Sequence, residues 1–441
     1  MSDASEIPEQ FATRALQRRP PFGDNPDVGT RGTRTQQRIL RAALEVFDEV
    51  GYHDCGVDKI TAKAKCSRPS FYQYFSSKED LFRHLSGDLA RRLFEITEAA
   101  ERITPDEDGW KAIRSFVSAY GELHDVYGPV FSVFSTAVAN DDAVASGAAR
   151  VSSRQAAALV GRIDRRALRY RRPEAVASVL LNGISRVQRF RQVVADAGGP
   201  GLERARVEDA LTDVVHRSFF GQLPGINVRA YVPMAATEAV APARALTRSA
   251  TPLGSAGRRT RNRLLDAARQ VFAARGYHDT RVDDIVELAE TSHGTFYRYF
   301  ENKQVLFRLL AARSGRRVVA AVEDLPAAVA VPGGEASSRE LRQWLRRYLT
   351  IYATEGPILR AWVEATRVDQ ELREASPAEV EALRRRLARF LAPREFGDVD
   401  ADALVLMALL DRSEPVVEAG LSDAASAVEA FTRVLQRGLL P

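Results

Sequence analysis

The sequence repeats itself, and this repeat constrains the fold more than any other feature. The segment that begins at Gly32 matches, without a gap, the segment that begins at Gly257, and Phe75 pairs with Phe300 at the same offset. About half of the paired positions are identical, which is typical of a duplicated folding unit. The similarity continues more weakly downstream, where the following residues correspond: Phe116, Tyr120, Gly128 and Pro129 with Trp344, Tyr348, Gly356 and Pro357.

Each copy opens with a pattern of short helices. In the first copy, apolar residues recur at helical spacing from Thr33 to Val50, and Gly51 ends this helix. A short helix follows, then the turn 65–67, and Ser67 can cap a helix over 68–75. Two short helices across a tight turn, with a longer helix on each side, predict a helix-turn-helix whose second helix projects into a DNA major groove.

The remainder of each copy also has helical periodicity. In the first copy it predicts helices at 110–126, 129–139, 151–169 and 173–195. Strand-type alternation is absent, so the predicted fold class is all-α. The expected domains are a flexible N-terminal arm (1–31), a first helix-turn-helix domain (32–80), a first helical regulatory domain (81–222), a linker rich in Pro, Ala, Gly and Ser (223–256), a second helix-turn-helix domain (257–305) and a second helical regulatory domain (306–441).

The aromatic motifs after the turn carry a family resemblance. FYQYFSSKEDL and TFYRYFENKQVL each follow the pattern GYHD-x-x-V-D-x-I. This combination resembles the TetR/AcrR family of bacterial transcriptional regulators, and it occurs twice in one chain. The resemblance implies a ligand-responsive, sequence-specific DNA-binding protein, with repression as the usual mode. The sequence departs from the family pattern at one position of each copy, where Lys65 and Glu290 replace the glycine that is common in the turn.

The helix after the turn supplies most of the predicted DNA contacts. Tyr72 and Tyr297 lie one residue from a phenylalanine pair that we expect in the core, and the resemblance implies that they touch phosphate or a thymine methyl group. Arg68 could pair with guanine, whereas His293 holds that place in the second copy. The two units should therefore read different bases. The predicted DNA-contacting residues are Arg34, Lys59, Ser67, Arg68, Ser70, Tyr72, Gln73, Tyr74 and Lys78, and Arg259, Ser292, His293, Thr295, Tyr297, Arg298, Tyr299 and Lys303.

Charge distinguishes the two units. Residues 57–78 hold five basic side chains against Asp58 alone, whereas residues 282–303 hold two basic side chains against five acidic ones. Because neutralisation of phosphates supplies much of the affinity for DNA, we expect the first unit to bind DNA more tightly than the second.

The regulatory domains are expected to hold a small, apolar effector. Predicted lining residues are Tyr120, His124, Tyr127 and Phe131 in the first copy and Trp344, Tyr348, Tyr352 and Trp362 in the second, although aromatic residues at helical spacing are more often core. Family members pair through their last two helices, so the resemblance favours an intramolecular pseudo-dimer, with a homodimer of chains as the alternative. A further alternative is a sensor or protein-interaction module in which only the first copy binds DNA.

Composition and motif content argue against secreted proteins, membrane proteins and enzymes. The two cysteines are too few for a disulfide framework, no apolar run is long enough to cross a membrane, and the N-terminus lacks a secretory signal, so we expect a cytoplasmic protein. No phosphate-binding glycine loop or metalloprotease motif occurs. We therefore expect no enzymatic activity, no cofactor and no metal.

Overall fold

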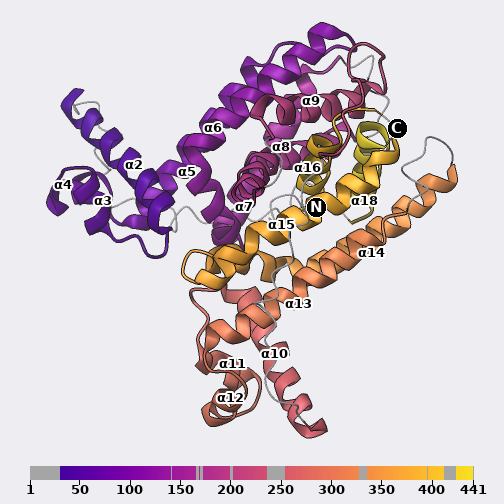
Figure 1. The fold of residues 1–441 in the computed structure, drawn as a ribbon. Coiled ribbons are helices and arrows are strands. Elements are labelled where there is room, and N and C mark those ends of the chain that lie inside the picture. Colours follow the sequence, from indigo (N-terminus) through magenta and orange to yellow (C-terminus); the bar gives the residue numbers. More distant parts are fainter. Residues whose placement is uncertain are drawn as a thin grey trace, which may run out of the picture. The chain divides into compact units, whose positions relative to one another are not determined.

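The helical fold class is confirmed, since the part of the chain that the structure describes has no β-strand (Figure 1). The structure is a computed structural model that describes residues 30–140, 142–164, 168, 172–198, 202–235, 254–326, 335–394, 396–411 and 424–440. It divides after Arg91 into a first unit and a larger second unit, Arg92–Pro441. The predicted arm lies outside the described residues except for its last two, which begin the first helix. No helix in the described ranges is long and apolar enough to cross a membrane.

The first unit has the predicted helix order. It contains α2 (Thr30–Val50), α3 (Val57–Lys63), α4 (Arg68–Tyr74) and the beginning of α5 (Lys78–Ala99). Gly51 ends α2 with a φ of 81°, a left-handed conformation that glycine adopts without steric cost. The core of this unit consists of buried apolar side chains from each helix, including Ile39, Ile60, Phe71 and Phe75.

The helical region after the first helix-turn-helix contains α6 (Glu107–Asn140), α7 (Asp142–Arg162), α8 (Pro173–Asp196) and α9 (Arg204–Phe220). The predicted break before Pro129 is wrong, because α6 continues through this proline. A proline inside a helix removes one hydrogen bond and costs about 3 kcal/mol. Packing of α6 along α7, α8 and α9 offsets this cost and keeps the helix whole.

The second copy repeats this arrangement of helices. Its helix-turn-helix unit comprises α10 (Ser255–Arg275), α11 (Val282–Leu288) and α12 (His293–Tyr299), followed by α13 (Lys303–Glu323). The helical region that follows comprises α14 (Glu335–Ala365), α15 (Gln370–Leu391), the short turn η4 (Ala392–Arg394), α16 (Val399–Leu410), α18 (Ala424–Arg433) and the π-helical turn η5 (Val434–Leu439). One hydrophobic core joins α10–α13 to α14 and α15, and Trp362 belongs to it.

Helices from the two copies pack against one another within the second unit. α8 contacts α15, α16 and α18, while α9 contacts α16 and η5 (Figure 1). The fully buried Arg217 of α9 donates from Nε to the carbonyl oxygen of Gly438 at 2.7 Å, and it also donates to the carbonyl oxygen of Asn227. Buried polar groups of the first copy thus find partners in the second.

The first part of the predicted linker is an ordered strap, residues 223–235. The backbone N–H of Val232 donates to the carbonyl oxygen of Gly397 at 2.9 Å, and Val399 donates back to Val232 at 3.1 Å. The fully buried Asn227 donates to His216 Nδ1 at 2.8 Å. The strap therefore ties the end of α9 to the start of α16. Residues 236–253 of the predicted linker lie outside the described residues.

Candidate nucleic-acid interface and effector cavity

Each of the two short helices after the turn has a buried face and an exposed face. On α4, Phe71 and Phe75 are buried while the adjacent Tyr72 is 51% exposed. On α12, Tyr297 is 55% exposed beside an equally buried phenylalanine pair. A serine hydroxyl caps each helix, since Ser67 and Ser292 accept hydrogen bonds from the backbone N–H three residues later. Both helices thus present a large aromatic side chain to solvent from a capped and anchored backbone.

The turn before each helix is left-handed at a residue other than glycine. Lys65 has a φ of 49° and Glu290 a φ of 48°. These are the positions at which the sequence departs from the family's usual turn glycine. The conformation costs a residue with a side chain about 1 kcal/mol, which each unit tolerates because the core phenylalanines fix the helices on both sides.

The first residue of each helix forms an ion pair with the preceding helix. Arg68 Nε lies 3.0 Å from Asp58 Oδ1, and at the equivalent position His293 Nε2 lies 2.5 Å from Asp283 Oδ1. All four side chains are more than half exposed, so these contacts contribute little to stability. They hold Arg68 and His293 over the turn, and a base contact would require either side chain to leave its aspartate.

The lysine that follows each helix has a structural partner. Lys78 Nζ donates to the carbonyl oxygen of Tyr52 at 2.8 Å, and Lys303 Nζ donates to those of Tyr277 and Thr280 at 2.8 and 2.9 Å. Burial lowers the pKa of Lys303 from its usual value. These ammonium groups tie the start of the next helix to the loop after the first helix, and their predicted phosphate contact would come in addition.

The other predicted DNA-contacting residues are distributed around the same surfaces. Lys59 is exposed, and its Nζ donates to the carbonyl oxygen of Asp54 at 3.1 Å. Arg298 lies over the ring of its neighbour Tyr299. Exposed members are Arg34, Gln73 and Arg259, and half-buried ones are Ser70, Tyr74, Thr295 and Tyr299.

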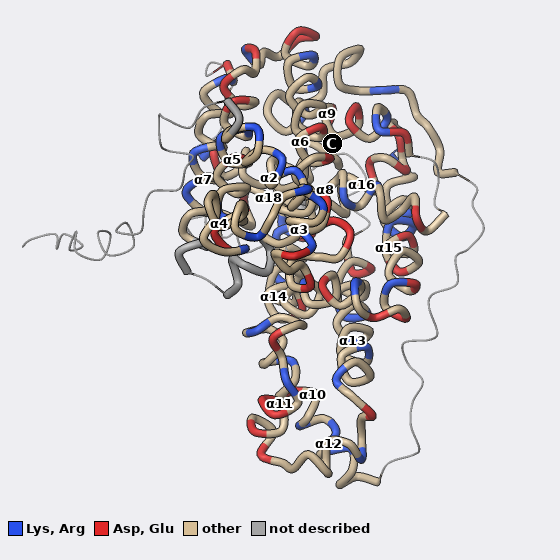
Figure 2. The backbone as a smooth tube through the Cα atoms, turned by 90° about the vertical axis from the view of Figure 1, so that its left-hand side faces the viewer, with Lys and Arg blue, Asp and Glu red and all other residues tan. Residues whose placement is uncertain are grey.

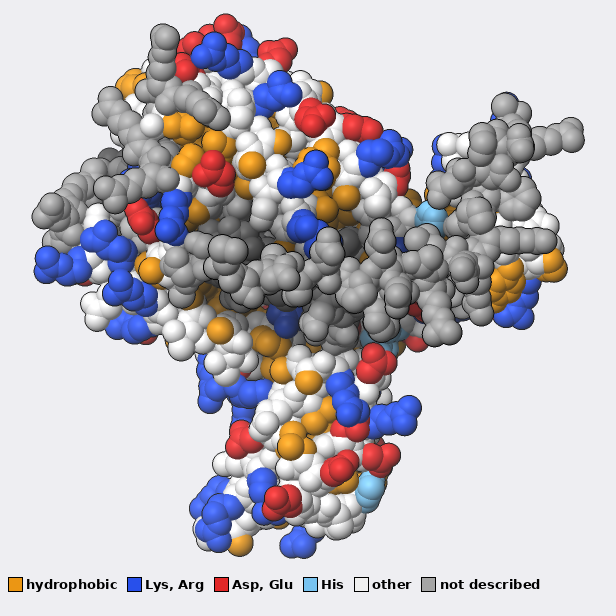
Figure 3. Space-filling view, turned by 180° about the vertical axis from the view of Figure 1, so that it is seen from behind, with side chains coloured by type: hydrophobic (Ala, Val, Ile, Leu, Met, Phe, Trp, Pro, Cys, Tyr) orange, Lys and Arg blue, Asp and Glu red, His pale blue; other side chains and the backbone are white. Residues whose placement is uncertain are grey.

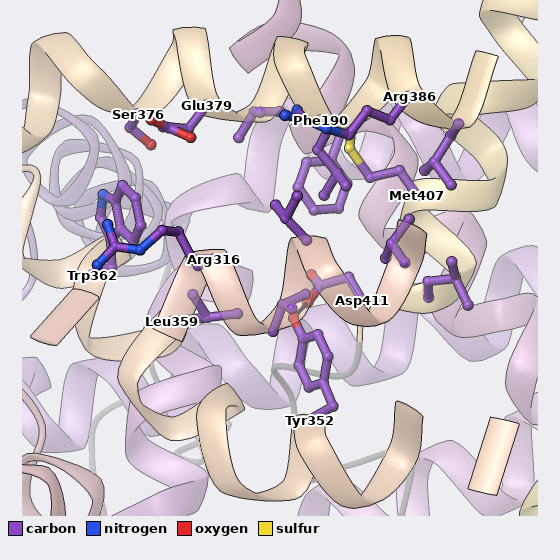
Figure 4. A pocket seen from close by; sticks show the side chains of 18 of the residues that line it. Phe190, Arg316, Tyr352, Leu359, Trp362, Ser376, Glu379, Arg386, Met407 and Asp411 are labelled. Carbon is purple, nitrogen blue, oxygen red and sulfur yellow. Dashed lines mark hydrogen bonds between the residues drawn. The ribbon is translucent and has the colours of Figure 1, made fainter. Parts of the chain in front are cut away.

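A cavity of about 710 Å³ lies in the second unit and takes walls from both copies (Figure 4). Of the predicted effector-binding residues, Tyr348, Tyr352 and Trp362 line it. The Tyr352 hydroxyl donates to Asp411 Oδ1 at 2.6 Å, and burial raises the pKa of this tyrosine well above its usual value. Trp344 does not line the cavity, because its indole is buried and donates to the carbonyl oxygen of Ala321 at 2.7 Å.

The predicted lining residues of the first copy pack on one another instead. His124 stacks on Phe131 with ring centroids 5.1 Å apart, and Tyr120 lies 6.2 Å from the same ring. Tyr127 is buried beneath Arg92, which lies over its ring. Burial lowers the pKa of His124 to about 4, with a further contribution from Arg189.

Comparison with known proteins agrees with the geometry of both helix-turn-helix units. A family model described as "Bacterial regulatory proteins, tetR family" matches residues 39–85 and again residues 264–310. The chain belongs to the TetR family, in two tandem copies.

Three TetR-type relatives show how far the similarity extends. The uncharacterized HTH-type transcriptional regulator YdgC of Bacillus subtilis is 40% identical over 70 residues, 16% of this chain and 36% of the relative. The HTH-type transcriptional activator FasR of Mycolicibacterium smegmatis is 34% identical over 132 residues, 29% and 57% respectively. The HTH-type transcriptional regulator TcmR of Streptomyces glaucescens is 30% identical over 151 residues, 33% and 64%. The chain thus spans between about a third and two thirds of the length of these relatives.

The charge of the TetR-type units is less unequal than the sequence count indicates. Lys63 lies 2.6 Å from Glu49 and 3.1 Å from Glu45, and these hydrogen bonds raise its pKa. Both glutamates lie on α2, outside the counted stretch. In the second helix-turn-helix unit, Arg275 pairs with Asp284 at 2.6 Å. Acidic residues nevertheless lie along α11 in Figure 2. In Figure 3, acidic and basic side chains are mixed over the lower part of the view, which contains the second helix-turn-helix unit.

Sequence reasoning missed the part of the cavity that comes from the first copy. Arg189, Phe190 and Val193 of α8 line it together with α13, α14, α15 and α16. Asn182 of α8 donates to the carbonyl oxygen of Asp411 at 3.1 Å, and Arg186 Nε lies 3.3 Å from Asp411 Oδ2. No local sequence signal could have found these contacts, since they join residues more than 200 positions apart.

Proposed function

We propose that the chain is a sequence-specific DNA-binding transcription regulator that inserts α4 and α12 into the major groove. The observation that carries this proposal is the repeated pair of exposed tyrosines, Tyr72 and Tyr297, each next to a buried phenylalanine pair. Contact with phosphate or with a thymine methyl group would explain why each small domain exposes a large aromatic side chain. The family relationship of both units supports the same function.

The first unit carries most of the DNA affinity in this proposal. Lys59 and Lys65 are exposed on it, where the second unit has Asp284 and Glu290. Carboxylates near phosphate oppose binding, so the second unit would bind weakly unless the first holds it in place.

The two copies act as a pseudo-dimer within one chain. The packing of α8 and α9 against α16, α18 and η5, together with the buried Arg217 and the strap, supports this arrangement. Light scattering should give the mass of a single chain, 48.7 kDa. A mass twice as large, stable to dilution, would favour the homodimer.

The regulator responds to a small, mainly apolar effector and represses transcription in its absence. The support for a response is the cavity, whose volume suits a drug-sized molecule. We infer repression because it is the usual mode of regulation in the family, although one relative, FasR, is named as an activator. A reporter gene placed behind the selected binding site gives the direction of regulation.

The second candidate is a sensor or interaction module in which only the first copy binds DNA. The specific observation in its favour is the acidic character of α11 in the second helix-turn-helix unit, where Asp283 pairs with His293 at the start of α12. In this case the α12 surface would stay free when DNA is bound.

Selection of bound genomic fragments by the purified chain, followed by footprinting at near-physiological salt, tests the proposal. A footprint over two unequal half-sites about one helical turn apart is the expected result. A footprint over one half-site favours the second candidate. No enrichment over random fragments by the folded, effector-free protein would contradict DNA recognition.

A further inference from the structure

The cavity of the second copy is mainly apolar, and most of its polar groups are already paired. Tyr352 donates to Asp411, and Arg386 Nε donates to Glu323 Oε1 at 2.7 Å. Alanine, valine, leucine, methionine and aromatic side chains form most of the remaining wall, and Ser376, Arg189, Arg316 and Glu379 complete it. The wall holds three basic and three acidic side chains, so it offers no excess of either sign to a strongly charged molecule.

One buried polar atom in the described wall has no hydrogen-bond partner. The indole Nε1 of Trp362 is buried and forms no hydrogen bond within the described residues, although Trp362 is only 9% exposed. Burying an N–H donor without an acceptor costs about 1–3 kcal/mol, so such a group needs an explanation. Figure 4 shows Trp362 beside Arg316 at one end of the cavity, with Phe190, Arg386 and Met407 toward the other.

The two copies share the cavity. Phe190 and its neighbours on α8 of the first copy close one side, and α13–α16 of the second copy form the others. A bound molecule would therefore touch both halves of the chain and sit at the junction where Asp411 meets Asn182 and Arg186.

We infer that this cavity binds an uncharged, elongated and mainly apolar molecule whose carbonyl or other oxygen accepts the hydrogen bond of the Trp362 indole, with Phe190 of the first copy as part of the binding wall. The inference rests on the proposed effector response and names the class of effector. The acceptor satisfies the buried N–H, and the apolar body covers the surface between Trp362 and Phe190. No charged group is required on the ligand.

Trp362 also connects the cavity to the second helix-turn-helix unit. It belongs to the same hydrophobic core as Phe296 and Phe300 of α12. Its ring lies close to Gly315 of α13, where an added Cβ would stand 3.4 Å from the indole. A ligand that fixes the Trp362 ring therefore acts on a side chain that packs within the core of a DNA-binding unit.

A matched pair of fluorescent probes tests the inference on the full-length chain. The first is 6-propionyl-2-dimethylaminonaphthalene, an uncharged apolar ketone, and the second is 2-dimethylaminonaphthalene, which lacks the acceptor. We expect the ketone to bind more tightly to the parent protein. Trp362→Phe should weaken ketone binding about fivefold, roughly 1 kcal/mol at 1.4 kcal/mol per factor of ten, and should leave the ketone-free probe unaffected.

Two further variants keep the test decisive. Trp344→Phe removes an indole outside the cavity and should change the affinity of neither probe, whereas Phe190→Ala should weaken both. Leu383→Trp, which fills the cavity from α15, should abolish binding of both probes while circular dichroism stays unchanged. If Trp362→Phe changes the affinity of the two probes equally, or changes neither, the proposed role of the indole is wrong. If Phe190→Ala leaves both affinities unchanged, the proposed contribution of the first copy to the binding wall is wrong.

DNA binding is measured separately in the same samples. Ketone binding that alters the affinity for the selected DNA supports both the site and the proposed response. Ketone binding without any change in DNA affinity supports the site and contradicts the response. Intact DNA binding by a protein that binds neither probe contradicts the inference while leaving the proposed DNA recognition in place.

Discussion

The ammonium group of Lys78 lies 4.3 Å from the centroid of the Tyr52 ring and donates to the carbonyl oxygen of the same residue. The second copy repeats this relationship, with Lys303 4.6 Å from the ring of Tyr277. A cation that both donates to the backbone and faces an aromatic ring fixes the loop after the first helix. The lysine of the family motif therefore has a structural role before any DNA is present.

We expect Lys78→Met to lower the thermal stability of the first unit in the absence of DNA. Hydrogen bonds to a charged donor are worth about 1.5–3 kcal/mol, and part of this is lost. The control is Lys59→Met, which removes an exposed lysine of the same unit. Lys78→Met could instead leave the stability unchanged and reduce the salt dependence of DNA binding by about one phosphate contact. That result would mean that Lys78 contacts the DNA backbone and has no structural role.

Tyr72→Ala should weaken DNA binding more than Tyr297→Ala. We expect a loss of about tenfold, or 1.4 kcal/mol, for the first and about threefold for the second, because acidic residues already limit the second unit. Tyr72→Phe and Tyr297→Phe separate the hydroxyl from the ring. Equal losses from the two alanine variants in a binding titration would contradict the proposed division of affinity.

Acid should destabilise the chain partly through His124. Its pKa in the folded protein, about 4, lies below the ordinary value of 6.5, because burial and then Arg189 disfavour the cation. Arg186 of α8 and Arg204 of α9 act in the same direction, while Asp125 opposes them. The stabilising contribution is therefore complete above pH 6.5 and is lost as the pH falls to about 4.

His124→Phe should flatten this part of the stability profile, since a phenyl ring stacked on Phe131 takes up no proton. The measurement is the urea midpoint at several pH values between 4 and 7. His216 is also buried with a lowered pKa, so some acid dependence will remain in the variant. A profile with the parent's slope would remove His124 from the explanation.

Arg217→Met should be the most damaging single change between the two copies. It leaves the carbonyl oxygens of Gly438 and Asn227 without their buried donor, and a buried acceptor left unpaired costs about 1–3 kcal/mol. The matched control is Arg206→Met, which removes a partly exposed ion pair with Asp398 at 2.8 Å and should cost less, about 1 kcal/mol. Similar unfolding midpoints for the two variants would argue against a cohesive junction.

Sequence patterns predicted the helix-turn-helix units because local spacing and capping decide them. Gly51 and Ser67 act where expected, whereas the left-handed turns at Lys65 and Glu290 form despite the missing glycine. Pro129 misled the assignment of α6, since long-range packing outweighed a local penalty. The shared cavity and the Lys63 ion pairs depend on helices that meet only in the folded chain. A single sequence contains no signal for such contacts.

The strap between α9 and α16 has a consequence for how such a regulator can evolve. In a dimer of identical chains every substitution appears twice, so neither half can change alone. Here the position after the turn is Arg68 in one half and His293 in the other, each with its own aspartate. In the proposed pseudo-dimer, one gene encodes two different DNA-binding surfaces, and their assembly is independent of the concentration of the chain in the cell.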